Sequence, residues 1–591
     1  MRLRLISLCF IGATVGLAGC SLPAEQAAPP TATAAPAKPK LGIKPFGTAD
    51  PNFKPDYSKL PPELAKTFAY IDEHIDEHVE ALQKWVRQPS VSNSGEGMPE
   101  SAEMVKGFFE ELGCQDARVF DPGPGEFGIG NPVVYAKCDE GAEKTLAIYW
   151  MYDNMPVTQP DNWIAPPFEA RIVSGEQAVV PTASRVVLGR GATNSKGGAM
   201  VSLQALRSMK AVLGKLPVNL IFVAEGDEER MSIGLRKFFR DHSDLMQEAD
   251  ALFAGGPSEG CVNFELITSG KAWGRGPVQS DIHGSNMRTA DSPAWRHIKM
   301  LGTLVSDDGN TPLVKGFFDN KEPPTPADVA QLKERAAKTD LVAMATNTGL
   351  ARYKWDNPYM VLKAASFETS FNLDGIFGGN MYAGGAGAIL PNKLTSKHHI
   401  RYVPKMDGFD IAKKFRAQLD ANGYKDVELK LIGDVPWSRG SSWDNDITRA
   451  GQKAIDVLAA VGLGSYQSPG SAPSPPPSAP RTTAWFMNSN GMGSDLDTEP
   501  TGGFWPSYVW TDGEVGQKIG SIAIPMGMGA SIFGTVSAGG GRAHGSNEYY
   551  IAESIDKNGG MANAEKGVVA TIYEYSKLTT TPPKPKTRAT K

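Results

Sequence analysis

The sequence predicts an α/β protein with a mixed, mostly parallel sheet flanked by helices and a smaller α+β domain inserted into the chain. Residues 146–151 and 218–224 are short apolar runs, as expected for buried strands. Residues 197–212 between them have helical periodicity, so strand, helix and strand alternate as in a parallel sheet. After Gly270 the pattern changes to a region with strands and helices of its own, which indicates the inserted domain.

The length of 591 residues exceeds what one compact core usually holds, so two domains are expected. We predict a main domain made of residues 56–270 and 430–580, with residues 271–429 inserted into it. Apolar side chains recur at helical spacing over residues 60–88, which predicts an amphipathic helix at the start of the main domain. Ser and Pro dominate residues 466–481, a composition typical of a surface loop.

The N-terminus predicts export. Two arginines precede an apolar run that is too short for a stable membrane span. Residues 17–20, Leu-Ala-Gly-Cys, resemble the bacterial lipobox, in which the cysteine is lipidated. We therefore expect a signal peptide over residues 1–19, lipid at Cys20 and an Ala/Pro-rich tether over residues 20–55. The protein would be held by its lipid on the periplasmic side of a membrane in the bacterial cell envelope, and an ordinary cleaved signal is the alternative.

Charge and cysteine content argue against several other classes. Basic and acidic residues nearly cancel at a net charge of −5, and no long basic run could follow a phosphate backbone, so no nucleic-acid partner is expected. Beyond the signal, Cys114, Cys138 and Cys261 have no paired spacing. This argues against a disulfide framework and against a CxxC zinc site, so we expect three buried single thiols.

Acidic side chains follow both predicted strands. Residues 225–229, Glu-Gly-Asp-Glu-Glu, come directly after the second strand, and Asp153 comes just after the first. Open α/β sheets place ligands at the carboxyl ends of their strands. Of the adjacent carboxylates Glu228 and Glu229, one could bind a metal while the other acts as a base. The alternative for this segment is a solvated acidic turn.

Six short motifs give these carboxylates a context. In order, they are D-x-x-P from 153, G-R-G-x-x-N-x-K-G-G from 189, E-G-x-E-E from 225, D-I-H-G from 281, I-R-x-V-P from 400 and A-H-G-x-N-E from 543. From about residue 60 to 578 the chain thereby resembles family twenty of the metallopeptidases, which includes aminoacylases, carnosinase-type dipeptidases and desuccinylases. The resemblance implies a zinc-exopeptidase-like fold whose inserted domain is a lid that forms a homodimer.

The same resemblance implies roles for individual residues. In the family a dinuclear zinc centre binds a water molecule, which a glutamate deprotonates before it attacks an amide carbonyl. By position, Glu228 would be the general base, and Glu229 and His544 would be metal ligands. Asp153 matches the aspartate that orients a ligand histidine.

The predicted lid carries two further candidates. His283 matches the histidine that polarises the scissile carbonyl across the dimer, and its alternative is a lone surface histidine in a hairpin. Arg401 matches the arginine that clamps the substrate carboxylate, and its alternative is a salt bridge on a strand face. A Ser195–Lys196 pair could also supply a nucleophile, although Lys196 more simply caps or packs at a helix start.

Three departures from the family pattern concern the metal ligands. Met151 stands where the first ligand histidine is expected, and a thioether is a poor zinc ligand. Asn194 stands where an aspartate bridges the two metals, and a carboxamide has no charge with which to bridge. No aspartate occurs at 254–256, where the family has a further ligand. We therefore expect one weakly bound Zn²⁺ or none, with Asn194 as a weak third ligand or a substrate contact.

These observations leave three hypotheses for function. The first is an amide or peptide hydrolase of the dipeptidase and aminoacylase type, with a degraded metal centre, acting on small peptides or N-acyl amino acids that carry a carboxylate. In it Glu228 activates water, and Asp153 shares a proton with it or acts as the acid. The second is an ordinary zinc dipeptidase with substitute ligands. The third is a non-catalytic lipoprotein that binds peptides or acyl amino acids.

Overall fold

The structure is a computed structural model that describes residues 40–578 apart from 48, 126–127, 247, 254–258, 383, 385, 404, 436–445, 465–469 and 471–538. The predicted signal peptide, Cys20, the tether up to residue 39 and all of the Ser/Pro loop except Gly470 lie outside the described residues. Within the described residues, no helix combines the length and the apolar character that a membrane span requires.

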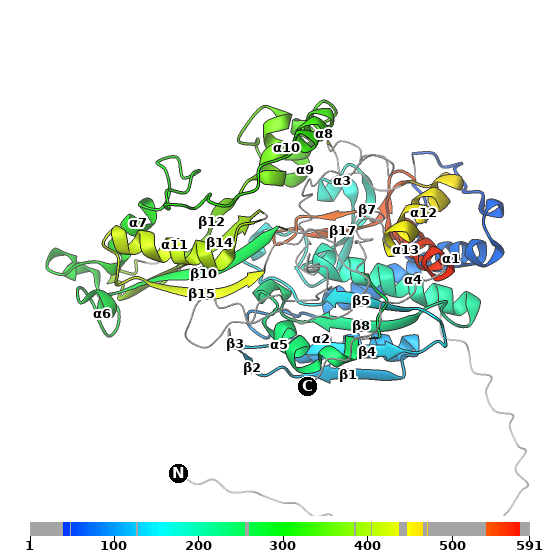
Figure 1. Cartoon of the computed structure of the whole chain (residues 1–591), viewed down its shortest axis with the longest axis horizontal. Helices are drawn as coiled ribbons and strands as arrows, with labels where there is room; N and C mark the ends of the chain where they lie inside the picture. The colour runs from blue at the N-terminus through cyan, green and yellow to red at the C-terminus, as the bar shows by residue number, and fades with distance from the viewer. Residues whose placement is uncertain are drawn as a thin grey trace, which may run out of the picture. The chain divides into compact units, whose positions relative to one another are not determined.

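A five-stranded sheet with the order β1-β4-β8-β5-β9 organises the main domain (Figure 1). Its strands are β1 (Asp116–Phe120), β4 (Val133–Cys138), β5 (Thr145–Met151), β8 (Asn219–Glu225) and β9 (Ala251–Phe253). Strand β5 runs parallel to both β8 and β9, whereas β1 with β4 and β4 with β8 are antiparallel. The predicted mixed α/β fold is confirmed, and its parallel part is the part that contains both predicted strands.

The side chains of β5 point alternately to the two faces of this sheet, and both faces are covered by other elements. Trp150 points to the face covered by α2 (Met98–Leu112) and α4 (Gly197–Leu213), where its indole N–H donates to Ser202. Tyr149 and Met151 point to the other face and share a buried cluster with Phe238 of α5 (Ile233–His242). Successive side chains of a strand point to opposite faces, so a strand that is apolar throughout must be covered on both sides.

Helices from both ends of the chain pack around α4. They are α1 (Pro62–Arg87) and α13 (Met561–Lys577), and α12 (Asp446–Ala460) lies against α13. The helices predicted over 60–88 and 197–212 are thereby confirmed as α1 and α4. Buried charges join α1 to α13, because His78 contacts Glu565 at 2.7 Å and Asp72 pairs with Lys566.

A second, antiparallel sheet brings two distant loops together. Its order is β16 (Gly540–Gly541), β17 (Tyr549–Ser554), β7 (Ala183–Leu188) and β6 (Arg171–Ser174). Because Tyr549 lies opposite Leu188, the loop that follows β7 lies beside the loop that precedes β17. The backbone N–H of Gly189 donates to the carbonyl of Glu548 at 2.9 Å.

The inserted region has its own sheet, in the order β12 (Ser370–Phe377), β14 (Lys393–Tyr402), β10 (Gly260–Ser269) and β15 (Glu428–Val435). Helices α7 (Pro293–Gly302) and α11 (Gly408–Ala421) pack on this sheet (Figure 1). Strand β10 lies entirely before the predicted range of 271–429, and β15 extends beyond its end. The change in sequence pattern at Gly270 therefore coincides with the end of the first lid strand, β10.

Smaller elements complete the described chain. In the lid they are α6 (Gly270–Trp273), β11 (Ile282–His283), η6 (Gly284–Arg288), α8 (Pro326–Ala336), α9 (Leu341–Thr348), α10 (Pro358–Phe367) and β13 (Ile389–Leu390). In the main domain they are η1 (Tyr57–Lys59), β2 (Pro124–Gly125), β3 (Gly128–Ile129), η2 (Pro160–Asn162), α3 (Gly175–Ala178), η3 (Ala192–Lys196), η4 (Glu228–Arg230) and η5 (Ser243–Met246).

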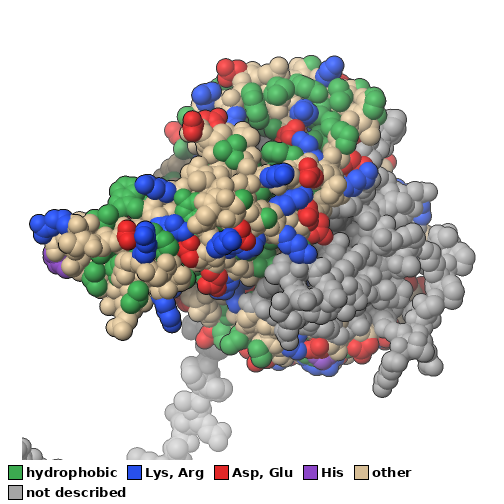
Figure 2. Space-filling view, turned by 60° about the vertical axis from the view of Figure 1, so that its left-hand side comes forward, with side chains coloured by type: hydrophobic (Ala, Val, Ile, Leu, Met, Phe, Trp, Pro, Cys, Tyr) green, Lys and Arg blue, Asp and Glu red, His purple; other side chains and the backbone are tan. Residues whose placement is uncertain are grey.

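Large apolar side chains such as Trp295 and Leu373 are exposed on the lid, and Figure 2 shows apolar side chains among basic and acidic ones on one face.

The expectation of three single thiols is wrong for two of the cysteines. Cys114 and Cys138 form a disulfide, and only Cys261 is a free, buried thiol among the described residues. The antiparallel pairing of β1 with β4 places Asp116 opposite Lys137, so the residue that follows α2 meets the last residue of β4. Sequence spacing alone gave no sign of this contact, because the 24-residue separation becomes a short distance only when β1 and β4 pair.

Loss of this disulfide should lower stability. Cys138→Ser should reduce the free energy of unfolding by about 3 kcal/mol, because the crosslink restricts the unfolded chain over a loop of this length. Urea unfolding with and without reductant measures the effect. Reductant should destabilise wild type and a Cys261→Ser control equally and leave Cys138→Ser unchanged. A wild type that does not respond to reductant would contradict the prediction.

Candidate active site

The parallel pairing of β5 with β8 brings the predicted carboxylates to one edge of the sheet. Met151 lies opposite Glu225, and the backbone N–H of Tyr152 donates to the carbonyl of Glu225 at 2.9 Å. The segments that follow β5 and β8 therefore leave the sheet side by side. One leads to Asp153 and the other leads to Glu228 and Glu229.

Asp153 holds the Glu228–Glu229 pair in place. One of its carboxylate oxygens accepts from the backbone N–H of Glu228 at 3.3 Å, and the other accepts from that of Glu229 at 3.0 Å. The Asp153 side chain is buried, and this burial, followed by the charge of Glu229, raises its pKa to about 8. Asp153 was predicted to match the residue that orients a ligand histidine. In this structure its carboxylate instead contacts the backbone of the two glutamates.

Glu228 lies within a buried group of acids made of Asp153, Glu225, Glu228 and Glu229, which we call the acidic cluster. Burial raises the pKa of Glu228 well above its usual range, and the charges of the other three members raise it further. Arg401 partly opposes this shift. Burial also raises the pKa of Glu225, whose carboxylate accepts from the hydroxyls of Tyr149 and Ser232.

Asn194, Glu229 and His544 meet at one point. The side-chain nitrogen of Asn194 lies 2.6 Å from a Glu229 oxygen and 3.0 Å from Nε2 of His544. The same Glu229 oxygen and Nε2 of His544 are 3.0 Å apart. Burial disfavours a charged His544, but the hydrogen bond to Glu229 and the charge of Glu229 raise the His544 pKa overall. Three residues that the sequence placed at ligand positions are therefore brought together.

A buried ion pair missed in the sequence supports this meeting point. Glu548 accepts from the backbone N–H groups of Thr193 at 3.0 Å and Asn194 at 2.9 Å. Its other oxygen pairs with Arg190 at 2.6 Å, and Arg190 also donates to the carbonyl of His544. Both side chains are buried, so each charge needs the other. The only signal was that both residues belong to the motifs that contain Asn194 and His544.

Ser195 and Lys196 do not act on each other in this structure. The Ser195 hydroxyl donates to the carbonyl of Met151 at 2.6 Å. The Lys196 ammonium donates to the carbonyls of Trp85 and Gln88 at 3.3 and 2.6 Å, at the C-terminal end of α1. Burial lowers the Lys196 pKa to about 7. Lys196 stands directly before α4, but its side chain caps the C-terminal end of α1 and not the helix start that the simpler hypothesis named.

The two lid candidates differ in their surroundings. Arg401 on β14 lies opposite Cys261 of β10, with its Nε 3.7 Å from Glu259. The positive charge of Arg401 lowers the pKa of Glu228, so Arg401 lies near the acidic cluster of the same chain. His283 is exposed on β11, where its ring contacts the hydroxyl of Ser285 at 2.8 Å.

The described residues do not fit a dinuclear zinc centre. The Asn194 nitrogen donates to Glu229 and lies 3.0 Å from Nε2 of His544, so the residue at the bridging position turns its nitrogen and not its oxygen toward these side chains. Met151 is buried among apolar side chains of the α5 face. Among the described residues, no group of three or more His, Cys, Asp or Glu side chains has the arrangement of a metal site. The expected position at 254–256 lies outside the described residues.

A mixed α/β sheet with paired carboxylates at its strand ends, and an inserted sheet whose arginine faces them, defines a hydrolase of the peptidase type with a lid. Residues 152–559 match the family described as peptidase family M20/M25/M40. Because this match spans well over half of the chain, the protein belongs to that family, and the resemblance seen in its motifs is confirmed.

Curated relatives and solved structures agree with this family. Human Beta-Ala-His dipeptidase is 26% identical over 419 residues, which cover 64% of this chain and 77% of that protein. Cys-Gly metallodipeptidase DUG1 of Candida albicans is 26% identical over 433 residues, covering 68% and 84%. The structures of human carnosine dipeptidase 1 and of Dug1p from Saccharomyces cerevisiae both give a TM-score of 0.64, at 20% and 21% identity. They cover 87% of this chain and 100% and 99% of the respective structures, which confirms the fold.

The buried Asp153 should make stability depend on pH. Its pKa is 3.8 when unperturbed and about 8 in the folded protein, so between these values the folded protein keeps a proton that the unfolded chain releases. The free energy of unfolding of metal-free protein should therefore fall as the pH rises from about 4 to about 8, by up to about 1.4 kcal/mol per pH unit for this proton.

Urea unfolding in chelator across this pH range tests the slope. Asp153→Asn should flatten it, whereas the exposed Asp161→Asn should leave it unchanged. An identical slope for wild type and Asp153→Asn would show that Asp153 does not hold the proton.

Proposed function

We propose that this protein hydrolyses the amide bond of small peptides or N-acyl amino acids that carry a free carboxylate, at a centre with one weakly bound metal ion or none. The observation that carries the proposal is the Glu228–Glu229 pair, which Asp153 holds through two backbone hydrogen bonds and which faces Arg401. Its relatives named as dipeptidases support the reaction type. A binding protein would not need a buried acid held in this way.

Proton transfer is the step that the chain's own residues can supply. Glu228 is buried beside three other acids, and together these raise its pKa, so the cluster favours the protonated acid. Arg401 and a carboxylate-bearing substrate near it would shift that balance. We infer that Glu228 and Asp153 share one proton, so that one carboxylate can accept a proton from water while the other returns a proton to the leaving nitrogen.

One metal ion is compatible with part of this arrangement. Glu229 and His544 are the side chains that would hold it, and the Asn194 oxygen would become a weak third ligand if its amide rotated. Such an ion would supply Lewis-acid polarisation of the carbonyl. Without an ion, the Asn194 nitrogen donates to Glu229 and lies beside His544, which is the observation that favours the second candidate, a peptide-binding protein without turnover.

The setting of the reaction is part of the same proposal. We infer an exported protein anchored by a lipid at Cys20, and the Cys114–Cys138 disulfide supports export because disulfides persist in oxidising compartments. We also infer a homodimer through the lid domain, in which the exposed His283 would reach the partner's substrate.

Removal of the Glu228 carboxylate tests the hydrolase directly. Glu228→Gln should lower kcat by about 10²–10⁴, the usual contribution of a positioned acid or base. Release of amino acid from a panel of dipeptides and acyl amino acids measures it, and exposed Glu176→Gln is the matched control. Turnover by Glu228→Gln equal to wild type would exclude this role. No turnover by wild type, together with saturable peptide binding, would favour the binding protein.

Arg401→Ala should weaken the binding of substrates that carry a carboxylate. The loss of a charged hydrogen bond costs about 1.5–3 kcal/mol and should appear as a higher KM. A C-terminally amidated substrate should be affected much less, because it has no carboxylate to lose. Arg401→Lys keeps the charge without the forked geometry and should fall between the two. Equal KM values for wild type and Arg401→Ala would remove Arg401 from the substrate site.

Restoring the missing ligands should raise zinc affinity. Met151→His with Asn194→Asp returns an imidazole and a charged carboxylate to the positions that the family uses for zinc. The double variant should retain more zinc after dialysis than wild type, as measured by elemental analysis. Asn194→Asp alone should unfold at a lower temperature in chelator, because it places a like charge beside Glu229. Wild type with two zinc ions per chain would contradict the degraded centre.

A further inference from the structure

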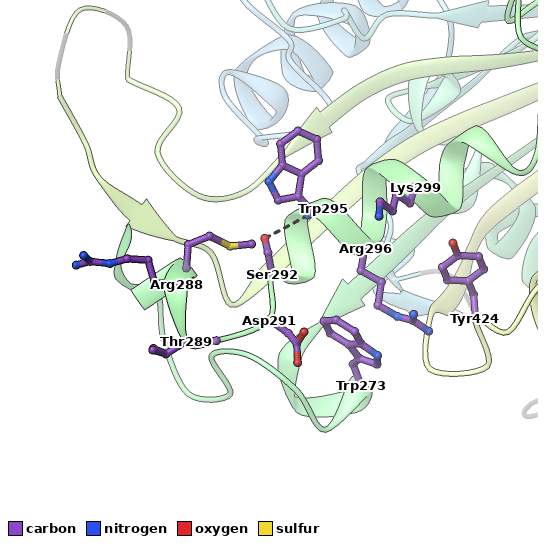
Figure 3. Close-up of a pocket in the computed structure, with 11 residues that line it drawn as sticks. Trp273, Arg288, Thr289, Asp291, Ser292, Trp295, Arg296, Lys299 and Tyr424 are labelled. Carbon is purple, nitrogen blue, oxygen red and sulfur yellow. Dashed lines mark hydrogen bonds between the residues drawn. The ribbon is translucent and has the colours of Figure 1, made fainter. Parts of the chain in front are cut away.

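A pocket of about 680 Å³ opens on the lid, between α6, η6, α7 and the turn before β15 (Figure 3). This volume lies in the range of about 300–1,000 Å³ that small-molecule sites occupy. None of the residues placed in the candidate active site lines it. The pocket is therefore a separate feature of the lid.

One face of α7 forms a wall of the pocket. The residues on this face are Ser292, Trp295, Arg296 and Lys299. Their spacing of three and four residues places them on the same side of a helix. His297 and Met300 lie on the other side and are buried against the lid sheet. The helix is thus anchored by one face and presents an aromatic and basic face to the pocket.

Arg296 fixes the aromatic walls. Its guanidinium lies 4.8 Å from the ring centre of Trp273 and 4.7 Å from that of Tyr424. Both oxygens of Asp426 accept from it, and it also donates to the carbonyl of Gly423 at 2.9 Å. Its charge is therefore neutralised, and its contacts hold the two rings at defined positions.

Two other cations of the pocket have no such neutralisation. Within the described part of the chain, no carboxylate forms an ion pair with Lys299 or Arg288, and Asp291 lies 3.8 Å from Arg275 instead. Trp295 is 60% exposed, which is high for so large an apolar side chain. Figure 3 shows the indole of Trp295 and the ammonium of Lys299 on the same side of α7, while the guanidinium of Arg288 points away from them.

We propose that this pocket binds a small organic anion with a flat apolar body, such as an aromatic carboxylate. Lys299 holds the anionic group, and the body lies against the exposed indole of Trp295 on the same side of α7. An anion gains a charged hydrogen bond there, and a flat body covers aromatic surface that is otherwise in water. The site is independent of the proposed hydrolysis.

Calorimetric titration of the full chain with indole-3-propionate tests the proposal. We use the Arg401→Ala background, in which the candidate active site is expected to bind a carboxylate more weakly. One saturable site is expected, and indole-3-propionamide, which lacks the charge, should bind about tenfold more weakly. Lys299→Met should weaken indole-3-propionate by a similar factor, and Trp295→Ala should weaken both compounds.

Lys271→Met is the matched control, because Lys271 is an exposed lysine of α6 that does not line the pocket. Its affinity should equal that of the background. Absence of saturable binding would overturn the proposal. This is also the result expected if a second copy of the chain covered the pocket. Equal affinity for the acid and the amide, or for Lys299→Met and the background, would also overturn it.

Discussion

The parallel pairing of β5 with β8 is the constraint on which the rest of the site depends. It fixes Met151 opposite Glu225, so the residues that follow the two strands leave the sheet together. Asp153 can then accept from the backbone of both Glu228 and Glu229, and these two hydrogen bonds define where the glutamates point. Asp153, Glu225 and Glu228 are all buried at these strand ends.

The second part of the site depends on a buried charge. Glu548, neutralised by Arg190, accepts from the backbone of Thr193 and Asn194 and so ties the loop after β7 to the loop before β17. The Asn194 amide is thereby aimed at Glu229 and His544. A carboxylate at this position would repel Glu229 unless a cation lay between them, whereas the amide nitrogen donates to Glu229. The Asn194 amide therefore holds Glu229 beside it without bringing a charge of its own.

The lid combines two kinds of chemistry on separate surfaces. Arg401, on β14, faces the acidic cluster and partly opposes the rise in the Glu228 pKa. On the lid helices, Arg296 is neutralised by Asp426 and serves to order Trp273 and Tyr424, which leaves Lys299 as a charge exposed beside aromatic surface. A basic residue in a motif, such as Arg401, can be recognised from the sequence. The roles of the basic residues of α7, Arg296 and Lys299, can be inferred only from the residues that surround them in the structure.

The sequence by itself determined the family, the two central strands, helices α1 and α4, and the residues Asp153, Asn194, Glu228, Glu229 and His544 as a candidate site. These features could be predicted because local periodicity indicates strands and helices, and short motifs indicate the residues that follow the strands. Only the tertiary structure decided the Cys114–Cys138 disulfide, the Arg190–Glu548 pair, the extent of the lid sheet and the role of Lys196 at the end of α1. Each of these joins segments that are distant in sequence, and such a contact is set by strand pairing and helix packing, which no local pattern of residues specifies.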